Sequence, residues 1–227
     1  MTLVEHDENL FSAEHEFGWQ GGLIRIPVRM TVIRLRAGPL ILHSPIPIPP
    51  DLREALDALG PVGFIVVPEA HGRFAEEAVA LYPDAVLLAA PDLPRRRRSR
   101  LVDASPGTLA DQPPAAWKGE VECLLLNGFR LHEVLLFHAP SRTLILTDLC
   151  FNIRSAPSRA SGLFFRANGM WQHFGPSRII RRIGVSDRKS FRASVERACA
   201  WDFTRIVPGH GEVIEPAGPE LIREAWW

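Results

Sequence analysis

Short apolar runs typical of β-strands alternate along the chain with segments of helical periodicity, and the alternation occurs in two successive rounds. The first round contains a helix over 51–59, in which Leu52, Leu56 and Leu59 fall on one face between Pro50 and Gly60. The other elements predicted in this round are strands at 29–35, 40–42, 64–67 and 85–88 and a helix at 73–81.

The second round contains a helix over 187–201, which Ser186 or Asp187 caps and which places Phe191, Val195 and Cys199 on one face. Its predicted strands lie at 121–126, 133–138, 143–146 and 205–207. Short strands with intervening helices predict an α/β fold in which helices cover β-sheets, without deciding between one sheet and two. The irregular segments, which the pattern leaves unassigned, are the Pro/Arg-rich residues 91–119 and the basic residues 152–185.

The overall charge is neutral, with 26 Lys and Arg against 26 Asp and Glu, so it indicates neither a nucleic-acid nor a membrane partner. The basic run at 95–100 is therefore interpreted as a solvated loop. The acidic first residues argue against a signal peptide, and no apolar run is long enough to span a bilayer. Cys123, Cys150 and Cys199 are widely spaced, which suits a reducing compartment. We expect one cytoplasmic domain over residues 1–227.

Three polar side chains follow apolar runs, at predicted strand ends where α/β folds commonly place their chemistry. His210 lies between two glycines, so no neighbouring side chain keeps a metal or substrate from its imidazole. Asp148 follows the strand 143–146, where a buried carboxylate needs a cation or backbone donors, and His71 follows the strand 64–67. Each alone is explained as a turn or helix cap. Together they are the ligand set of a mononuclear metal site with open coordination positions.

Several short motifs over nearly the whole chain carry a resemblance to a known superfamily. They are Arg29-Met30-Thr31, Leu42-His43-Ser44-Pro45, Glu133, Pro140-Ser141-Arg142-Thr143-Leu144, Thr147-Asp148-Leu149, Ala200-Trp201-Asp202-Phe203 and Gly209-His210-Gly211-Glu212-Val213-Ile214. Through them the chain resembles the metallo-β-lactamase fold superfamily, and within it the domains catalogued as DUF4336. The resemblance implies an α/β (α+β) fold, a four-layer αββα sandwich with the site at one edge of the two sheets.

The resemblance also implies that only part of the superfamily's site is kept. Catalytic members hold two metals with an H-x-H-x-D-H motif, a histidine in a T-P-G-H-T-like turn, a bridging aspartate and a G-H-G histidine. When His71 is matched to the last histidine of the first motif, four ligand positions carry other residues. These positions are Val66, Pro68, Ala70 and Phe129. His71, Asp148 and His210 match ligands of the second metal, and a one-residue slip in the alignment would bring in Glu69.

Three functions are open at this point. The first is a metal-dependent hydrolase-like enzyme, in which His71, Asp148 and His210 hold one transition metal, Zn²⁺ or Fe²⁺. A metal-activated water would attack an ester, amide or phosphoester-type small molecule, with Asp148 and His210 as catalytic residues. The second is a catalytically degenerate, metal-free binding or structural module, and the third is metal-free catalysis with Ser44 or Cys150 as nucleophile. We favour the metal-dependent enzyme, because three ligand positions that no longer bound a metal would have no physical reason to keep two histidines and an aspartate.

Other residues give weaker signals. His43 lies where the superfamily's acidic turn orients a ligand, which favours a positioning role. His138 ends an apolar strand, where solvent exposure is expected, although a hairpin could carry it toward Asp148. Trp226 and Trp227 are expected to pack on the core or against a partner subunit, in a homodimer.

Overall fold

The computed structural model describes residues 1–90 and 107–227, without the side chains of Glu69 and Ala70. The basic run at 95–100, which the sequence predicts to be a solvated loop, lies outside the described residues. Within the described ranges, none of the helices has both the length and the apolar character needed to cross a membrane.

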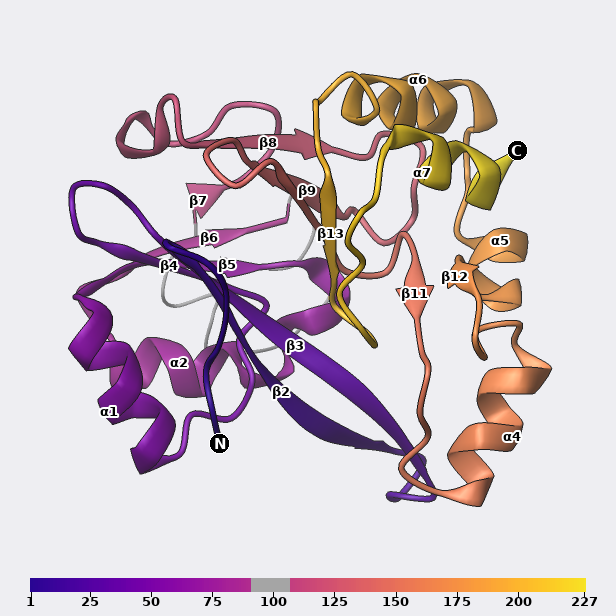
Figure 1. Ribbon diagram of the computed structural model, residues 1–227, viewed down its shortest axis with the longest axis horizontal. Helices are drawn as coiled ribbons and strands as arrows, with labels where there is room; N and C mark the ends of the chain where they lie inside the picture. Colours follow the sequence, from indigo (N-terminus) through magenta and orange to yellow (C-terminus); the bar gives the residue numbers. More distant parts are fainter. Residues whose placement is uncertain (91–106) are drawn as a thin grey trace.

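Two β-sheets face each other at the centre of the described structure (Figure 1). The first has the strand order β1-β2-β3-β4-β5-β6-β7 and the second the order β13-β10-β9-β8. The strands of the first sheet are β1 (Val4–Asp7), β2 (Leu10–Trp19), β3 (Ile24–Arg34), β4 (Leu40–His43), β5 (Val62–Val67), β6 (Val86–Ala89) and β7 (Gly107–Thr108). Those of the second are β8 (Val121–Leu125), β9 (Val134–His138), β10 (Thr143–Leu146) and β13 (Arg205–Pro208). A separate short pair joins β11 (Phe151–Asn152) and β12 (Phe174–Gly175).

Helices cover the outer face of each sheet, which gives four layers (Figure 1). The first sheet is covered by α1 (Pro50–Leu59) and α2 (Ala75–Leu81), and the second by α6 (Arg188–Ala198) and α7 (Pro219–Trp226). The 3-10 segment η1 (Glu69–Phe74), which is kinked at His71, lies between β5 and α2, and the 3-10 turn η3 (Ala115–Trp117) lies between β7 and β8. This architecture confirms the four-layer α/β sandwich. The segment without a sequence prediction contains α4 (Arg159–Ala167) and α5 (Arg178–Ile183), which lie beyond one edge of the sheets.

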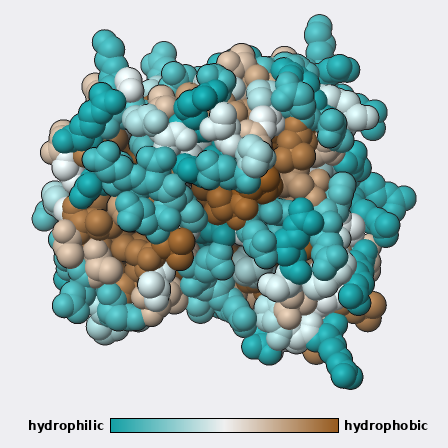
Figure 2. Space-filling model, viewed as in Figure 1, coloured by the Kyte–Doolittle hydropathy of each residue, from teal (hydrophilic) through white to brown (hydrophobic). Residues whose placement is uncertain are grey.

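Alternation along the strands divides the core into three apolar layers. In β4, Leu40 and Leu42 pack against α1, while Ile41 points into the layer between the two sheets. In β10, Leu144 faces α6 and α7, and Ile145 faces the first sheet. Strands buried on both faces have continuous apolar sequences, which explains why they were predictable. On the outer surface hydrophilic side chains predominate, and apolar atoms form separate patches on the face in Figure 2.

The first strands of the chain differ from the prediction, which began the sheet at residue 29. β2 and β3 form a long antiparallel hairpin with a register from Leu10↔Ile33 to Trp19↔Ile24. Only the first four residues of β2 are all buried, and the rest alternate toward exposed positions. The far half of the hairpin reaches beyond the sheet toward α4 (Figure 1), so it lacks the apolar run that marks a buried strand.

Candidate metal centre

Four polar side chains follow the ends of two parallel strand pairs. β4 is parallel to β5, and Ser44 directly follows β4 while His71 lies in η1 after β5. β10 is parallel to β13, and Asp148 and His210 lie two residues beyond the ends of these strands. Because parallel strands present their carboxyl ends at the same edge of a sheet, the four side chains meet although the chain separates them widely.

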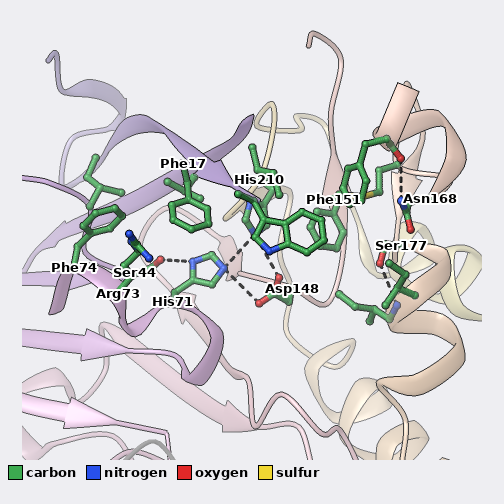
Figure 3. A pocket seen from close by; sticks show the side chains of 18 of the residues that line it. Phe17, Ser44, His71, Arg73, Phe74, Asp148, Phe151, Asn168, Ser177 and His210 are labelled. Atoms are coloured by element: carbon green, nitrogen blue, oxygen red, sulfur yellow. Dashed lines mark hydrogen bonds and ion pairs between the residues drawn. The ribbon is translucent and has the colours of Figure 1, made fainter. Parts of the chain in front are cut away.

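The three sequence-predicted site residues lie in contact. His71 Nε2 is 3.1 Å from His210 Nε2 and 3.4 Å from Asp148 Oδ2, and His210 Nε2 is 3.4 Å from Asp148 Oδ1. Figure 3 shows the three side chains pointing toward one another among the residues that line a cavity. Among the residues that the structure describes, these three form the group whose ligand atoms, all within 4.8 Å of one another, could hold a metal ion.

The second nitrogen of each imidazole has a hydrogen-bond partner. His210 Nδ1 donates to the carbonyl oxygen of Pro27 at 2.7 Å, so the Nε2 of a neutral His210 presents its lone pair. His71 Nδ1 lies 2.7 Å from the Ser44 hydroxyl, which can accept from this nitrogen or donate to it. When Ser44 accepts, both Nε2 lone pairs face the carboxylate, which is the arrangement a metal ligand needs.

The spacing of these atoms tests whether the residues fit a metal ion. Ligand atoms bound to one tetrahedral Zn²⁺ at about 2.0–2.1 Å lie about 3.3–3.4 Å from one another. The observed separations of 3.1, 3.4 and 3.4 Å agree with this spacing, and the two-histidine, one-carboxylate set also suits Fe²⁺. Without a cation, one Nε2 must carry a proton so that two lone pairs do not face each other. The donor set fits a single metal ion.

Charge at the site is set by Asp148. Burial alone would raise the pKa of this carboxyl, but its contacts with His71 and His210 hold the pKa well below the usual range. Asp148 is therefore an ionised carboxylate facing two imidazoles, a combination that favours a cation.

Two buried ionisable side chains hold the backbone that carries the site. Glu133 accepts hydrogen bonds from the backbone N–H groups of Thr147 (2.6 Å) and Asp148 (3.1 Å). Burial, together with the charge of Asp148, raises the pKa of Glu133 to about 8, and the two N–H donors act against that rise. The Arg29 guanidinium donates to the carbonyl oxygen of Pro208 at the end of β13. Sequence analysis included both residues only as marks of the resemblance, since their roles depend on which distant backbone lies beside them.

The glycines on either side of His210 are required by close packing. A Cβ on Gly209 would lie 3.3 Å from His71 Cε1, so a side chain there would crowd the neighbouring imidazole. Gly211 has φ +88°, and a Cβ would lie 2.1 Å from the carbonyl oxygen of Asn152. The sequence analysis predicted that these glycines leave space at the imidazole, and the structure adds the contact with β11.

A cavity of about 460 Å³ opens over the three side chains, a volume within the range of small-molecule sites. Its walls are mainly apolar and come from β2, β3, η1, β11 and the α4–α5 segment. The aromatic and thioether side chains among them are Phe17, Trp19, Phe74, Phe151, Phe164 and Met170. Apolar walls limit the water around the donor set and strengthen electrostatic interactions there.

The remaining sequence candidates have different outcomes. Cys150 is fully buried, and burial raises the pKa of its thiol well above the usual value, so it is not an activated nucleophile. His138 is 1% exposed, so the expected solvent exposure is wrong. It pairs with Thr143 at the end of β10 opposite Asp148, and therefore does not reach the site. His43 is buried in β4, and its positioning role stays a prediction. The side chain of Glu69 lies outside the described structure.

Known structures with a similar fold are metallo-β-lactamases. DIM-1 metallo-β-lactamase exposed to ceftazidime has a TM-score of 0.64 and 15% identity, covering 99% of this chain and 95% of that one. FIM-1 from Pseudomonas aeruginosa in the mono-zinc form has a TM-score of 0.62 and 12% identity, covering 99% and 92%. At these identities the likeness shows the fold alone, and it defines a protein of the metallo-β-lactamase fold. Among curated proteins, none matches the chain.

The family can be stated more closely from the sequence itself. Residues 8–168 match the family model described as domain of unknown function (DUF4336), which covers more than half of the chain. The chain therefore belongs to the DUF4336 family. It has the metallo-β-lactamase fold, and the group His71, Asp148 and His210 could hold a metal ion.

Proposed function

We propose that this protein is a hydrolase that uses one transition metal ion, Zn²⁺ or Fe²⁺, held by His71, Asp148 and His210. The observation that carries the proposal is the mutual spacing of the three ligand atoms, 3.1–3.4 Å, at the base of an apolar cavity. When bound, such an ion polarises a carbonyl or phosphoryl oxygen and acidifies water, which suits ester, amide or phosphoester hydrolysis.

The surrounding residues have positioning roles in this proposal. Ser44 and the Pro27 carbonyl fix the imidazole rings through Nδ1, so that both Nε2 atoms point at the same position. Glu133 fixes the backbone on either side of the Thr147–Asp148 peptide, which orients the carboxylate. The aromatic walls bind the apolar part of the substrate and exclude bulk water.

Three broader proposals accompany the function. We propose that residues 1–227 act as one domain, because side chains of both sheets share the central apolar layer. A cytoplasmic location is favoured by Cys123, Cys150 and Cys199, which are buried free thiols. A homodimer stays a prediction, with the half-exposed Trp227 as its candidate contact.

The contact between Ser44 and His71 favours a second candidate function, a metal-free serine hydrolase. Ser44 lines the cavity, has φ +59°, and places its hydroxyl 2.7 Å from His71 Nδ1. The other ring nitrogen of His71 faces Asp148, so a Ser–His–Asp arrangement exists in which Ser44 would donate its proton to His71. This function requires that activity survive chelation and disappear in Ser44→Ala.

Metal content tests the first proposal directly. Protein purified without a histidine tag is expected to contain about one equivalent of transition metal, and His210→Ala is expected to contain almost none. His173→Ala is the matched control, because His173 is exposed and does not line the cavity. Folding of each variant is checked by circular dichroism.

The outcomes separate the candidate functions. A metal-free protein whose melting temperature is unchanged by added Zn²⁺, Fe²⁺ or Mn²⁺ would exclude the metal-dependent hydrolase. The metal-free binding module, in which a proton between the imidazoles takes the place of the cation, and the serine hydrolase would then remain. Activity that disappears in Ser44→Ala would favour the serine hydrolase over the binding module.

A further inference from the structure

The cavity contains one cationic side chain among its described lining residues, that of Arg73. Its guanidinium carbon lies 5.1 Å from the centroid of the Phe17 ring, so the planar group is held against an aromatic surface. In the described part of the chain, Arg73 forms neither a hydrogen bond nor an ion pair. Stacking leaves the guanidinium N–H donors available, and they match the geometry of a carboxylate or phosphate.

The two sides of the cavity differ in chemistry. In Figure 3, Arg73, Phe17 and Ser44 lie on one side of the His71–Asp148 pair, and Phe151 lies on the other. Beyond Phe151 the wall is formed by the α4–α5 segment, where the lining side chains are largely apolar. The exposed apolar residue Ile179 continues this wall to the protein surface.

The charge of the α4–α5 segment agrees with an anionic ligand. Residues 149–186 contain six arginines and no Asp or Glu, although the chain as a whole is neutral. This segment supplies one wall of the cavity, but none of its arginines is among the lining residues, so their positive charge acts on a bound anion only at long range. A ligand with an apolar body and a negative group matches the apolar walls and the guanidinium of Arg73, and the long-range charge is of the same sign.

We propose that the cavity binds an anionic amphiphile, whose carboxylate or phosphate pairs with Arg73 and whose alkyl or aryl part lies along Phe151 and the α4–α5 wall. The proposal deepens the proposed function by naming its substrate class. A ligand held at both ends passes over His71, Asp148 and His210, which places its middle, where an ester or amide bond would be cleaved, at the metal position. Arg73 is the specificity-determining residue for the anionic end.

Binding of simple probes tests the substrate class without any turnover. Decanoate, decyl phosphate and decanol are titrated, below their micelle concentrations, into untagged protein freed of metal with a chelator. Calorimetry is expected to show that an anion binds about tenfold more tightly than decanol, and that Arg73→Gln removes this preference without changing decanol binding by more than about twofold. The anion that binds more tightly shows whether the site prefers a carboxylate or a phosphate headgroup.

Matched variants separate a specific anion site from general effects. Arg53→Gln removes another half-exposed arginine, on α1 outside the cavity, and is expected to leave all three affinities unchanged. Ile179→Gln is expected to weaken all three probes about equally, since it changes the apolar wall. Arg73→Lys keeps the positive charge but lacks the planar guanidinium that can donate two parallel hydrogen bonds, and is expected to retain part of the anion preference.

Several results would overturn the amphiphile site. It fails if decanol binds as tightly as both anions, or if Arg53→Gln weakens the anions as much as Arg73→Gln. The metal measurement is independent of this outcome. Arg73-dependent anion binding in a protein that takes up no metal would refute the hydrolase alone, whereas one bound metal without anion preference would refute the amphiphile site alone.

Discussion

Replacing Glu133 should destabilise the protein through the turn that carries Asp148. The two oxygens of this buried carboxylate accept the Thr147 and Asp148 backbone N–H groups at 2.6 and 3.1 Å. Leucine has a similar volume but no acceptor, so Glu133→Leu leaves two buried donors unpaired. Each unpaired donor costs about 1–3 kcal/mol, which gives a loss of about 2–6 kcal/mol in the free energy of unfolding. Glu133→Gln keeps one acceptor oxygen and should lose about half as much.

The assay is urea denaturation at pH 9, above the pKa of about 8 given to Glu133 by burial and Asp148, so that the wild-type carboxylate is ionised. Thermal melting should give a parallel decrease of at least about 4 °C for Glu133→Leu, since about 2–4 °C corresponds to 1 kcal/mol in a chain of this length. Glu5→Leu, at an exposed position on strand β1, serves as control and should change stability by less than about 1 kcal/mol. A Glu133→Leu variant within about 0.5 kcal/mol of wild type would refute the idea that this carboxylate secures the turn.

Three further perturbations test the rest of the fold. Burial lowers the pKa of His138 to about 4, so the unfolded chain takes up a proton near pH 6.5 while the folded protein does not. The free energy of unfolding should therefore fall on acidification, and in urea titrations wild type should lose about 2 kcal/mol more than His138→Gln between pH 8 and pH 5. Gly211→Ala should destabilise strongly because its Cβ meets backbone, whereas Gly119→Ala, also at positive φ but with nothing within 4 Å, should cost only about 1 kcal/mol; equal losses would contradict the packing argument. Trp226→Ala should lower the free energy of unfolding by about 3–5 kcal/mol, and Trp227→Ala by under about 1 kcal/mol, because the first side chain is 7% and the second 51% exposed.

The sequence predicted the buried strands well because their physical signal is local. Strands such as β5 and β10 are covered on both faces, so every residue is apolar and the run is visible in isolation. β2 was missed because its far half is solvent-exposed and alternates with charged residues, a pattern that many loops share. The α4–α5 segment was missed because its helices are short and amphipathic, with several apolar side chains left at the surface.

The candidate site was predictable only in its residue types. Two histidines and an aspartate after apolar strands are a local pattern, and their convergence follows from parallel strand pairing. The contacts that position them are not local. Ser44 reaches His71 because β4 and β5 end together, and Pro27 reaches His210 because β3 passes beside the β13 turn. No spacing rule in the sequence encodes these two contacts.

The positions that the resemblance assigns to the first metal explain why one ion is the coherent expectation. Val66 is 2% exposed and belongs to the apolar layer between the sheets, and Phe129 is 2% exposed and stacks on Phe191 under α6. These two side chains belong to the packed apolar core and do not line the cavity. A histidine or carboxylate at either position would be buried without hydrogen-bond partners. His71, Asp148 and His210, in contrast, line an open cavity and retain hydrogen-bond partners that orient them. If the whole site had lost its function, nothing would keep His71, Asp148 and His210 together and oriented while the positions of Val66 and Phe129 became part of the apolar core.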